Sequence, residues 1–466
     1  MLAANVLGVR VAVFAAAIGA LAGVGRAAAG EPCRLEVVDR ENGWPVPLVE
    51  LRTTHDLRFV TDNAGVIALD APELLDREIW FEVAGHGYGV ERDGFGHRGV
   101  RLTPRRGETL RVEVERTIIA RRLGRLTGGG LFAESQKLGE RLDHREAGVF
   151  GCDTVQMATH GGKHYWLWGD TDLPSYALGV FHSTSATTPL RPVVSFEPPL
   201  AVEYDYFRDA NGAPRAVAQM PGDGPTWITA MASLPDRDGQ QRLVGAYAKI
   251  NPPLDPYECG LCVWNDDAEK FELHRKIWEK SAAAERPLMP NGHALFWNDD
   301  DGRKWLMFGN PLPTFRCPAT FEAWQDPSTW EAITPPRTLR AAGGGEEVKP
   351  QSGSVAWNAY RQRWVTVFLQ LFGKPSGFGE IWYAESTAPT GPWGPAVKVL
   401  SHDNYTFYNP RVHAELTDPD SPILLFEGTY TSTFADRPER TPRYDYNQVL
   451  YRLDLDDLAL QAAQKR

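Results

Sequence analysis

The chain contains the stretch KHYWLWGD (residues 163–170), an apolar run that follows a Gly-Gly turn and ends on polar residues. The same pattern has four further copies. They are QRLVGAYAK (241–249), RKWLMFGN (303–310), QRWVTVFLQ (362–370) and PILLFEGTY (422–430). Turns that separate runs of β-branched and aromatic residues are typical of β-hairpins. We therefore interpret each copy as the second strand of a hairpin.

A candidate inner strand precedes each of these second strands. The inner strands are residues 153–159, 227–233, 293–297, 353–357 and 410–416. The units recur about every 55 to 80 residues, which is long for a four-stranded blade but leaves room for loop insertions. The pattern predicts an all-β chain in which residues 146–460 form a five-bladed β-propeller.

Residues 31–116 alternate apolar and polar residues over short stretches, separated by Asn-Gly and Asn-Ala-Gly turns. This alternation predicts a small antiparallel β-sandwich that precedes the propeller. The stretches VVDRENGWPVPLVEL (37–51), FVTDNAGVIAL (59–69) and VAGHGYG (83–89) resemble transthyretin-like and carboxypeptidase-regulatory modules. The resemblance implies an accessory domain that supports a neighbouring catalytic domain.

Residues 117–145 connect the two predicted domains. They are rich in arginine and leucine up to the break at Gly128-Gly129-Gly130. This composition predicts a linker with a short helix packed between the domains, followed by a loop. The basic run is typical of a solvated or interdomain face rather than of a binding patch.

The charge of the chain excludes one class of partner. The formal net charge is −11, and Lys and Arg form no dense stripe. Nucleic acid is therefore not expected as a partner, because neutralising its phosphates needs clustered cations. The 15 Trp, 15 Tyr and 20 Phe fit the packing of β-sheets, or else supply stacking platforms for sugars. The second interpretation predicts a carbohydrate as the partner.

Residues 1–30 have the pattern of an export signal. Arg10 precedes an apolar run at residues 11–25, and three alanines follow at 27–29, as in secretory signals. An uncleaved N-terminal anchor is the alternative. No other stretch is apolar enough to span a bilayer. We expect a secreted or periplasmic monomer with no stable membrane insertion after the signal is cleaved.

Two blade-closing phrases resemble a known group of enzymes. They are IWYAESTAPTGPWGPAVKVL (381–400) and GVFHSTSATTPLRPVVSF (179–196). These two segments resemble those of the five-bladed propeller glycoside hydrolases of the arabinanase, xylosidase and fructosidase groups. The resemblance implies action on a poly- or oligosaccharide. Those families commonly place the general base in an Asp-Pro-Asn or similar tripeptide, whereas this chain has Gly151-Cys152-Asp153-Thr154. The base is therefore assigned by position and not by motif.

The catalytic assignment follows from the geometry of a propeller, in which inner-strand starts and the loops after second strands meet at one end of the channel. Glycoside hydrolysis needs a protonated carboxyl and a carboxylate that activates water or attacks directly. We assign Asp153 as the base, Glu427 as the acid and Asp170 as a group that orients or tunes the acid. The structural alternatives are a turn cap for Asp153 and a hairpin end for Asp170. For Glu427 the alternative is an ion pair with Arg411 or Arg443.

Further residues at the same end are assigned to substrate binding. They are Trp168, Asp172, Trp227, Lys249, Glu258, His293, Asn310, Gln351, Asn409 and Tyr430. Lys249 would suit an acidic sugar, with a solvated lysine as the alternative. His293 could bind a sugar, hold a structural ion in the channel or carry a proton, with a structural histidine as the alternative. No metal ligands and no other cofactor are expected.

Two other functions fit the same residues. A polysaccharide lyase would use His293 or Tyr430 as the base, with Lys249 or Arg411 neutralising a uronate. A carbohydrate-binding protein without catalysis would use its carboxylates only as turn caps.

Overall fold

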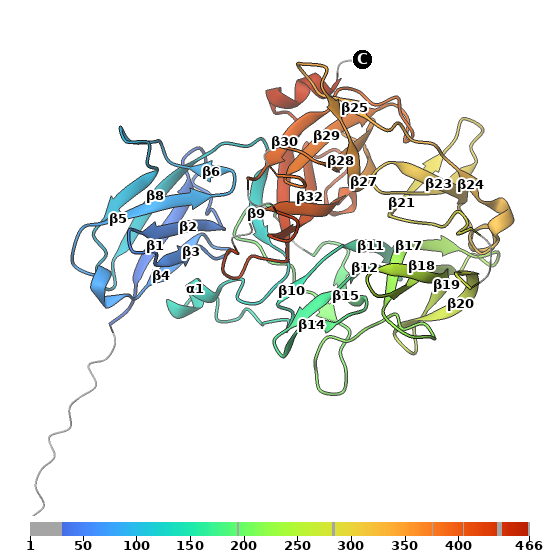
Figure 1. Cartoon of the computed structure of the whole chain (residues 1–466), viewed down its shortest axis with the longest axis horizontal. Helices are drawn as coiled ribbons and strands as arrows, with labels where there is room; N and C mark the ends of the chain where they lie inside the picture. Colours follow the sequence, from blue (N-terminus) through green and yellow to red (C-terminus); the bar gives the residue numbers. More distant parts are fainter. Residues whose placement is uncertain are drawn as a thin grey trace, which may run out of the picture.

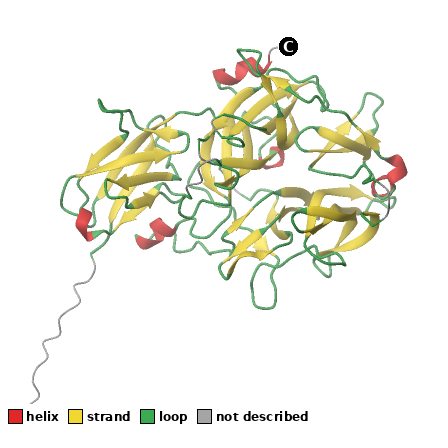
Figure 2. Cartoon of the chain, in the orientation of Figure 1, coloured by secondary structure: helices red, strands yellow, loops and turns green. Residues whose placement is uncertain are grey.

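The computed structural model describes residues 30–464, apart from residues 193–194, 282–284, 375, 404 and 436–439. The predicted export signal therefore lies, except for Gly30, outside the described residues. Strands make up nearly all of the regular structure (Figure 2), which confirms the all-β fold class. Within the described ranges, no helix is both long enough and apolar enough to cross a membrane.

The few helices are short. They are α1 (Ala133–Lys137), α2 (Phe321–Trp324) and the 3-10 helices η1 (Pro72–Leu74), η2 (Pro327–Thr329), η3 (Ala414–Leu416) and η4 (Leu458–Gln464). The helical segments are short, so packing between sheets supplies most of the core, with η4 adding the buried Leu460 beside blade four.

The N-terminal domain is one eight-stranded sheet around an apolar core that includes Leu35, Leu51 and Phe81. Its strands are β1 (Cys33–Asp39), β2 (Val49–Thr53), β3 (Arg58–Val60), β4 (Val66–Leu69), β5 (Ile79–Gly85), β6 (Tyr88–Gly89), β7 (Gly99–Leu102) and β8 (Thr109–Arg116). The strand order is β3-β2-β5-β6-β8-β1-β4, with β7 beside β5. β1 and β8 are parallel. The prediction of an antiparallel sandwich is therefore wrong for this pair of strands. Hairpin turns join antiparallel strands, so they do not predict a parallel pair.

Five four-stranded antiparallel sheets follow in the propeller. Blade one is β11 (Gln156–His160), β12 (Lys163–Trp168), β15 (Thr184–Pro189) and β16 (Asp205–Tyr206). Blade two is β17 (Thr226–Pro235), β18 (Gln241–Asn251), β19 (Asp255–Asn265) and β20 (Lys270–Glu279). Blade three is β21 (His293–Asn298), β22 (Lys304–Gly309), β23 (Pro313–Pro318) and β24 (Glu331–Ala332). Blade four is β27 (Pro350–Asn358), β28 (Arg363–Gln370), β29 (Glu380–Ser386) and β30 (Val397–Ser401).

Blade five combines both ends of the propeller sequence. Its strands are β31 (Thr406–Val412), β32 (Ile423–Thr431), β33 (Asn447–Asp454) and β9 (Arg121–Arg125). Two small sheets lie outside the blades. They are β10 (Gly151–Cys152) with β13 (Thr171–Leu173) and β14 (Tyr176–Val180), and β25 (Leu339–Arg340) with β26 (Glu347–Val348).

The turns that the sequence marks do separate the inner and second strands. Gly161 and Gly162 join β11 to β12 with φ of 55° and 77°, a left-handed conformation that glycine adopts without steric cost. Between β21 and β22, the Asp299 side chain accepts a 2.7 Å hydrogen bond from the Arg303 amide. Local turn chemistry therefore sets the register of these hairpins.

The inner strands contact one another in sequence order around the channel, from β11 through β17, β21 and β27 to β31. Side chains then link blade five to blade one. The Asn409 Nδ2 group donates a 2.7 Å hydrogen bond to Thr154 Oγ1, and the Arg411 guanidinium donates to the Met157 carbonyl at 3.4 Å. The ring is thereby closed on its inner side.

The outer side of the ring is closed by β9, which pairs antiparallel with β33 (Figure 1, cyan beside red). The sequence analysis expected a short helix in this arginine- and leucine-rich run. That prediction is wrong, because the free edge of β33 offers backbone partners that an isolated segment lacks, and tertiary context overrides local propensity. A short helix does occur in the linker, at α1, after the triple-glycine break.

Buried arginines of β9 join the two domains. The Arg122 guanidinium is buried and donates to the Pro47 carbonyl at 3.0 and 2.7 Å and to the His86 carbonyl. In the other direction, the Asn63 side chain of the N-terminal domain accepts from the Arg125 amide at 3.0 Å and donates to the Arg125 carbonyl at 2.9 Å. The strand that closes the propeller therefore also anchors the N-terminal domain.

We expect Arg122→Met to lower the free energy of unfolding by about 2–4 kcal/mol, because it leaves buried carbonyl groups without their charged donor. Chemical denaturation followed by tryptophan fluorescence measures the change. Arg111→Met, which alters an exposed arginine of β8, is the control and should change stability by less than about 0.5 kcal/mol. Equal losses in the two variants would contradict the anchoring role of Arg122.

Candidate active site

A cavity of about 530 Å³ opens at the end of the channel where inner strands begin and second strands end. Seven of the residues assigned from the sequence line it. They are Asp153, Asp170, Trp227, His293, Asn310, Gln351 and Asn409. They come from all five blades or from the loops that lead into them, so the structure brings together side chains that are up to about 250 residues apart in the sequence.

Asp153 lies between β10 and β11 and is partly buried. Its Oδ2 atom accepts a 2.5 Å hydrogen bond from the Tyr408 hydroxyl of blade five, and the nearby Tyr446 hydroxyl donates to the Asp170 carbonyl at 3.2 Å. Burial raises the pKa of Asp153, whereas the hydrogen bond from Tyr408 lowers it. A Cβ atom at Gly169 would lie 2.3 Å from Asp153 Oδ1, so glycine is needed there to leave space for the carboxyl.

The segments on both sides of the blade junction adopt left-handed backbone conformations. Thr154 has φ of 47° and Asn409 has φ of 52°, which is uncommon for residues other than glycine and unfavourable for a β-branched threonine. The hydrogen bond between their side chains and a 3.3 Å bond from the Thr154 amide to Thr429 Oγ1 hold this arrangement. Such locally unfavourable conformations are concentrated at functional sites.

Asp170 follows β12 and faces the same cavity. Its Oδ1 atom accepts a 3.1 Å hydrogen bond from Trp227 Nε1. Burial, followed by the neighbouring Asp153 charge, raises the pKa of Asp170 to about 7. Asp153 accepts from the Tyr408 hydroxyl, whereas Asp170 accepts from the Trp227 indole and lies beside the Asp153 charge. Of the two groups, Asp153 is therefore the better stabilised as an anion and Asp170 the better suited to keep its proton.

The rest of the cavity wall is rich in neutral hydrogen-bonding groups. Gln156, Asn291, Asn310, Gln351 and Asn409 all line it. Asn310 Oδ1 accepts a 2.8 Å hydrogen bond from the Gly353 amide, which leaves its amide nitrogen for a ligand. Amides of this kind can donate to and accept from sugar hydroxyls.

His293 opens the inner strand of blade three, as the sequence predicts. Burial, with a contribution from the Arg411 charge, lowers the pKa of His293 to about 3. The imidazole is therefore neutral at ordinary pH. Its Nδ1 atom has no hydrogen-bond partner among the described residues.

Glu427 does not line the cavity, and this corrects its assignment as the acid. The side chain is fully buried within blade five, where its Oε1 atom lies 2.6 Å from His413 Nε2. Burial raises the pKa of Glu427 to about 8. The ion pairs considered for Glu427 with Arg411 and Arg443 do not form either, since Arg411 pairs with Glu415 and Arg443 with Glu134. Strand position placed Glu427 near the channel end, but its side chain points between sheets.

Lys249 and Glu258 of blade two also point away from the cavity. The Lys249 ammonium is buried and donates to the carbonyls of Met220, Gly222 and Gly224 at 3.2, 2.9 and 2.7 Å. Glu258 accepts a 2.8 Å bond from the Tyr247 hydroxyl and lies 2.6 Å from Lys276 Nζ. Both residues therefore stabilise blade two, and neither takes part in the candidate site.

The other three assigned residues have structural roles as well. Trp168 is fully buried and stacks on Tyr206 with ring centroids 5.2 Å apart. Asp172 accepts a 2.6 Å hydrogen bond from the Leu178 amide and thereby holds the β13–β14 hairpin. Tyr430 stacks on Tyr405 with ring centroids 4.1 Å apart, and its ring centroid lies 6.2 Å from that of His86 in the N-terminal domain. Alternation along each strand sends these side chains to the packed face.

Sequence reasoning missed Tyr408, Tyr446, Phe378 and Phe434. Tyr408, Phe378 and Phe434 line the cavity, and the Tyr446 hydroxyl donates to the Asp170 carbonyl. A signal existed for Tyr408, because it alternates with the buried Phe407 in β31 and must face the opposite side of the sheet. The other three lie in loops, where no periodic pattern fixes the direction of a side chain.

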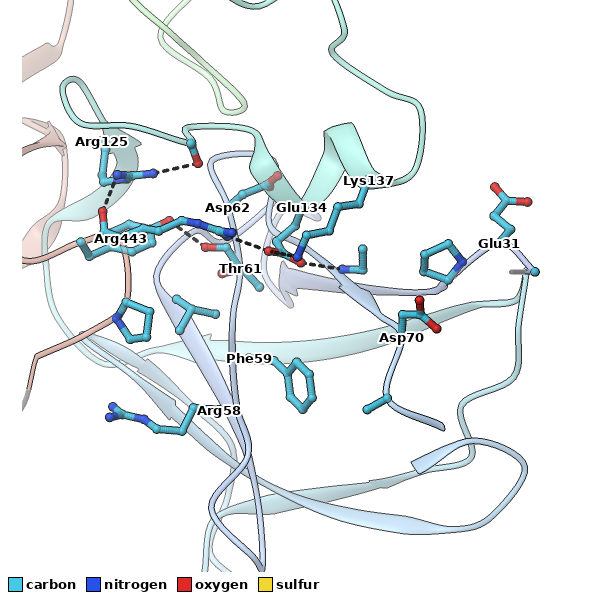
Figure 3. A pocket seen from close by; sticks show the side chains of 18 residues that line it. Glu31, Arg58, Phe59, Thr61, Asp62, Asp70, Arg125, Glu134, Lys137 and Arg443 are labelled. Carbon is cyan, nitrogen blue, oxygen red and sulfur yellow. Dashed lines mark hydrogen bonds and ion pairs between the residues drawn. The ribbon is translucent and has the colours of Figure 1, made fainter. Parts of the chain in front are cut away.

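A larger hollow of about 920 Å³ lies between the N-terminal domain and the propeller. Figure 3 shows Lys137 and Arg443 directed at Glu134, which they meet at 2.8 and 2.6 Å. Arg125 donates to backbone carbonyls there, including that of Gly130 at 2.9 Å. These charges are used in joining the domains, so the hollow is a weaker candidate for catalysis than the channel cavity.

The described part of the chain contains no group of three or more His, Cys, Asp or Glu side chains arranged to hold a metal ion. All five cysteines are buried and free. Cys259 and Cys262, whose spacing is like that of a metal or disulfide motif, lie in β19 as buried thiols.

No protein-family model matches the chain, and no curated protein matches it. Solved structures do match it. An exo-1,5-α-L-arabinanase from a bovine ruminal metagenomic library has a TM-score of 0.37 and 12% identity, over 66% of this chain and 94% of that chain. An exo-β-1,3-galactanase from Phanerochaete chrysosporium has a TM-score of 0.37 and 10% identity, over 66% and 61%.

A glycoside hydrolase family 43 enzyme from Xanthomonas citri, complexed with xylotriose, has a TM-score of 0.36 and 12% identity, over 65% of this chain and 86% of that chain. At these identities and TM-scores, none of the three structures assigns an activity to this chain.

The raised pKa of Asp170 has a consequence for stability. The folded state favours the protonated carboxyl, so its contribution is fully present below the ordinary value of 3.8 and is lost as the pH rises through about 7. Asparagine cannot ionise. We therefore expect the unfolding temperature of Asp170→Asn to rise relative to that of the wild type between pH 4 and pH 8. Asp238→Asn, which changes an exposed turn, is the control, and its unfolding temperature should differ from that of the wild type by the same amount throughout this pH range. If the difference for Asp170→Asn were also constant with pH, the raised pKa of Asp170 would be refuted.

Proposed function

We propose that the chain is a glycoside hydrolase-like enzyme that cleaves a poly- or oligosaccharide in the channel cavity. One observation carries this proposal: two neighbouring carboxyl groups, Asp153 and Asp170, face a cavity whose lining also carries amides and aromatic rings, and burial raises the pKa of both, that of Asp170 to about 7. A protonated and an ionised carboxyl are the two groups that glycoside hydrolysis needs.

In the proposed mechanism, Asp170 donates its proton to the glycosidic oxygen as the bond to the leaving group breaks. Asp153 acts on the other reactant, either by removing a proton from water or by attacking the anomeric carbon. Tyr408 fixes the orientation of Asp153, while Trp227 fixes that of Asp170. The proposal thus keeps Asp153 as base and transfers the acid role from Glu427 to Asp170.

A lyase is less well supported. His293 lines the cavity as a neutral imidazole, but Tyr430, Lys249 and Arg411 do not line it. Among the described residues that do, there is no lysine or arginine. A uronate carboxylate would therefore be desolvated without a cation opposite it, which is unfavourable.

We also propose that the enzyme is exported and acts on a substrate outside the cytoplasm. The support is the signal-like composition of residues 1–30. Fractionation of expressing cells, with mass measurement of the purified chain, tests the export and the cleavage together.

We expect Asp153→Asn and Asp170→Asn each to lower kcat/KM by about 100-fold or more, because each removes a group that transfers a proton in the transition state. A panel of plant, algal and bacterial glycans with mass detection of the products identifies the substrate and measures the rates. Glu427→Gln is the matched control, since it changes a buried carboxyl outside the cavity, and it should retain activity.

Two results would overturn these assignments. The first is full activity in Asp153→Asn and Asp170→Asn together with loss of activity in Glu427→Gln. The second is saturable binding of a glycan with no product from any member of the panel, which would identify a binding protein.

The acid role of Asp170 also predicts a pH dependence. Only the protonated form donates, so kcat/KM should fall about tenfold per pH unit once the pH is well above 7. A pH–rate profile of the wild-type chain measures this limb. A rate that rises with pH above 7 would assign Asp170 to the base instead.

A further inference from the structure

Four bulky apolar side chains lie on the segments that join the second and third strands of their blades. Leu178, Leu254, Phe372 and Phe434 are 43%, 64%, 74% and 60% exposed. Leu178 lies in β14 of blade one, and the other three lie in the loops after the second strands of blades two, four and five. These four positions are called the tips below. Leu254 and Phe434 line the cavity itself, and Phe372 contacts the lining residue Phe378.

The backbone at all four tips is in a left-handed conformation. The φ angles are 52° at Leu178, 125° at Leu254, 57° at Phe372 and 69° at Phe434. Glycine or asparagine is the usual residue in such positions, and a bulky side chain there costs of order 1 kcal/mol or more. Within the described residues, these are the only exposed leucines or phenylalanines with a left-handed φ. Neither backbone conformation nor burial therefore explains why these positions are apolar.

Contacts between rings connect the tips to the catalytic carboxyl. Phe372 stacks on Phe378 with centroids 6.5 Å apart, Phe378 meets Phe434 edge-on at 5.8 Å, and Phe434 meets Tyr408 at 5.7 Å. The Tyr408 hydroxyl in turn binds Asp153. A continuous aromatic surface thus runs from solvent into the cavity.

The chemistry changes along this surface. Inside, amides and two carboxyl groups can bind sugar hydroxyls. Outside, phenylalanine and leucine offer no donor and no acceptor, so only apolar contact stabilises a ligand there. The Asp172 carboxylate accepts a 2.6 Å hydrogen bond from the Leu178 amide. This bond holds the backbone at Leu178 in a defined position.

We propose that the four tips form a binding site for an apolar group joined to the sugar, an alkyl or aryl aglycone. This inference rests on the proposed function in one respect: the cavity holds the sugar, and the tips hold what is attached to it. A neutral sugar with a hydrophobic substituent fits both the cavity and the tips. The proposal commits to a ligand rather than to a membrane surface because the ring contacts lead inward to Asp153.

The test compares methyl and hexyl glycosides of arabinose, xylose, galactose and glucose in both anomeric forms, with binding to the full chain measured by calorimetry. We expect at least one hexyl glycoside to bind about tenfold or more tightly than its methyl partner. The double variant Phe372→Asn with Phe434→Asn should lose this preference. Asparagine tolerates the left-handed backbone, so the variant keeps its fold.

Phe95→Asn is the control, since Phe95 is 93% exposed on the N-terminal domain, and it should keep the preference. The inference is overturned if no hexyl glycoside binds more tightly than its methyl partner, or if the double variant keeps the preference. It is also overturned if the chain sediments with phosphatidylcholine vesicles through Phe372 and Phe434 while showing no hexyl preference.

Binding is measured without turnover, so the two proposals can fail separately. A hexyl preference that the double variant loses, in a chain that hydrolyses nothing, would support the apolar site and reject the hydrolase. Hydrolysis with equal affinity for methyl and hexyl glycosides would support the hydrolase and reject the apolar site.

Discussion

Closure of the ring is the constraint on which the candidate site depends. Blade five takes its outer strand from the segment that precedes blade one, through the pairing of β9 with β33. On the inner side, the bonds from Asn409 to Thr154 and from Tyr408 to Asp153 cross the same junction. The carboxyl proposed as the base is thus positioned by residues about 255 places later in the chain. A propeller that failed to close would lose the site along with its stability.

The same junction holds the N-terminal domain through hydrogen bonds. β9 lies between the two domains, and its arginines donate to carbonyls of the N-terminal domain. Charge-assisted bonds in a buried setting are costly to break, because separation leaves polar groups unsatisfied. The N-terminal domain therefore supplies hydrogen-bond acceptors that stabilise the closing strand.

Within the cavity, hydrogen bonding and charge distinguish the two carboxyl groups. Burial raises the pKa of both, but Asp153 accepts a hydrogen bond from the Tyr408 hydroxyl, while Asp170 has an indole donor and a neighbouring negative charge. A difference in hydrogen bonding of this size is enough to assign the proton to one member of a pair. The apolar tips outside the cavity add a second contrast, between a polar interior and a mouth without hydrogen-bonding groups.

The sequence by itself determined the hairpins, their turns, the repeat of the blades and the position of Asp153, because strand periodicity and turn chemistry act over a few residues. Only the tertiary structure decided which side chains reach the cavity. Lys249 and Tyr430 lie near strand ends, whereas Glu427 lies in the middle of β32. All three side chains face packed layers, since one step along a strand reverses the direction of a side chain. The pairing of β9 and the role of Tyr408 were likewise decided by long-range contacts, which no local pattern encodes.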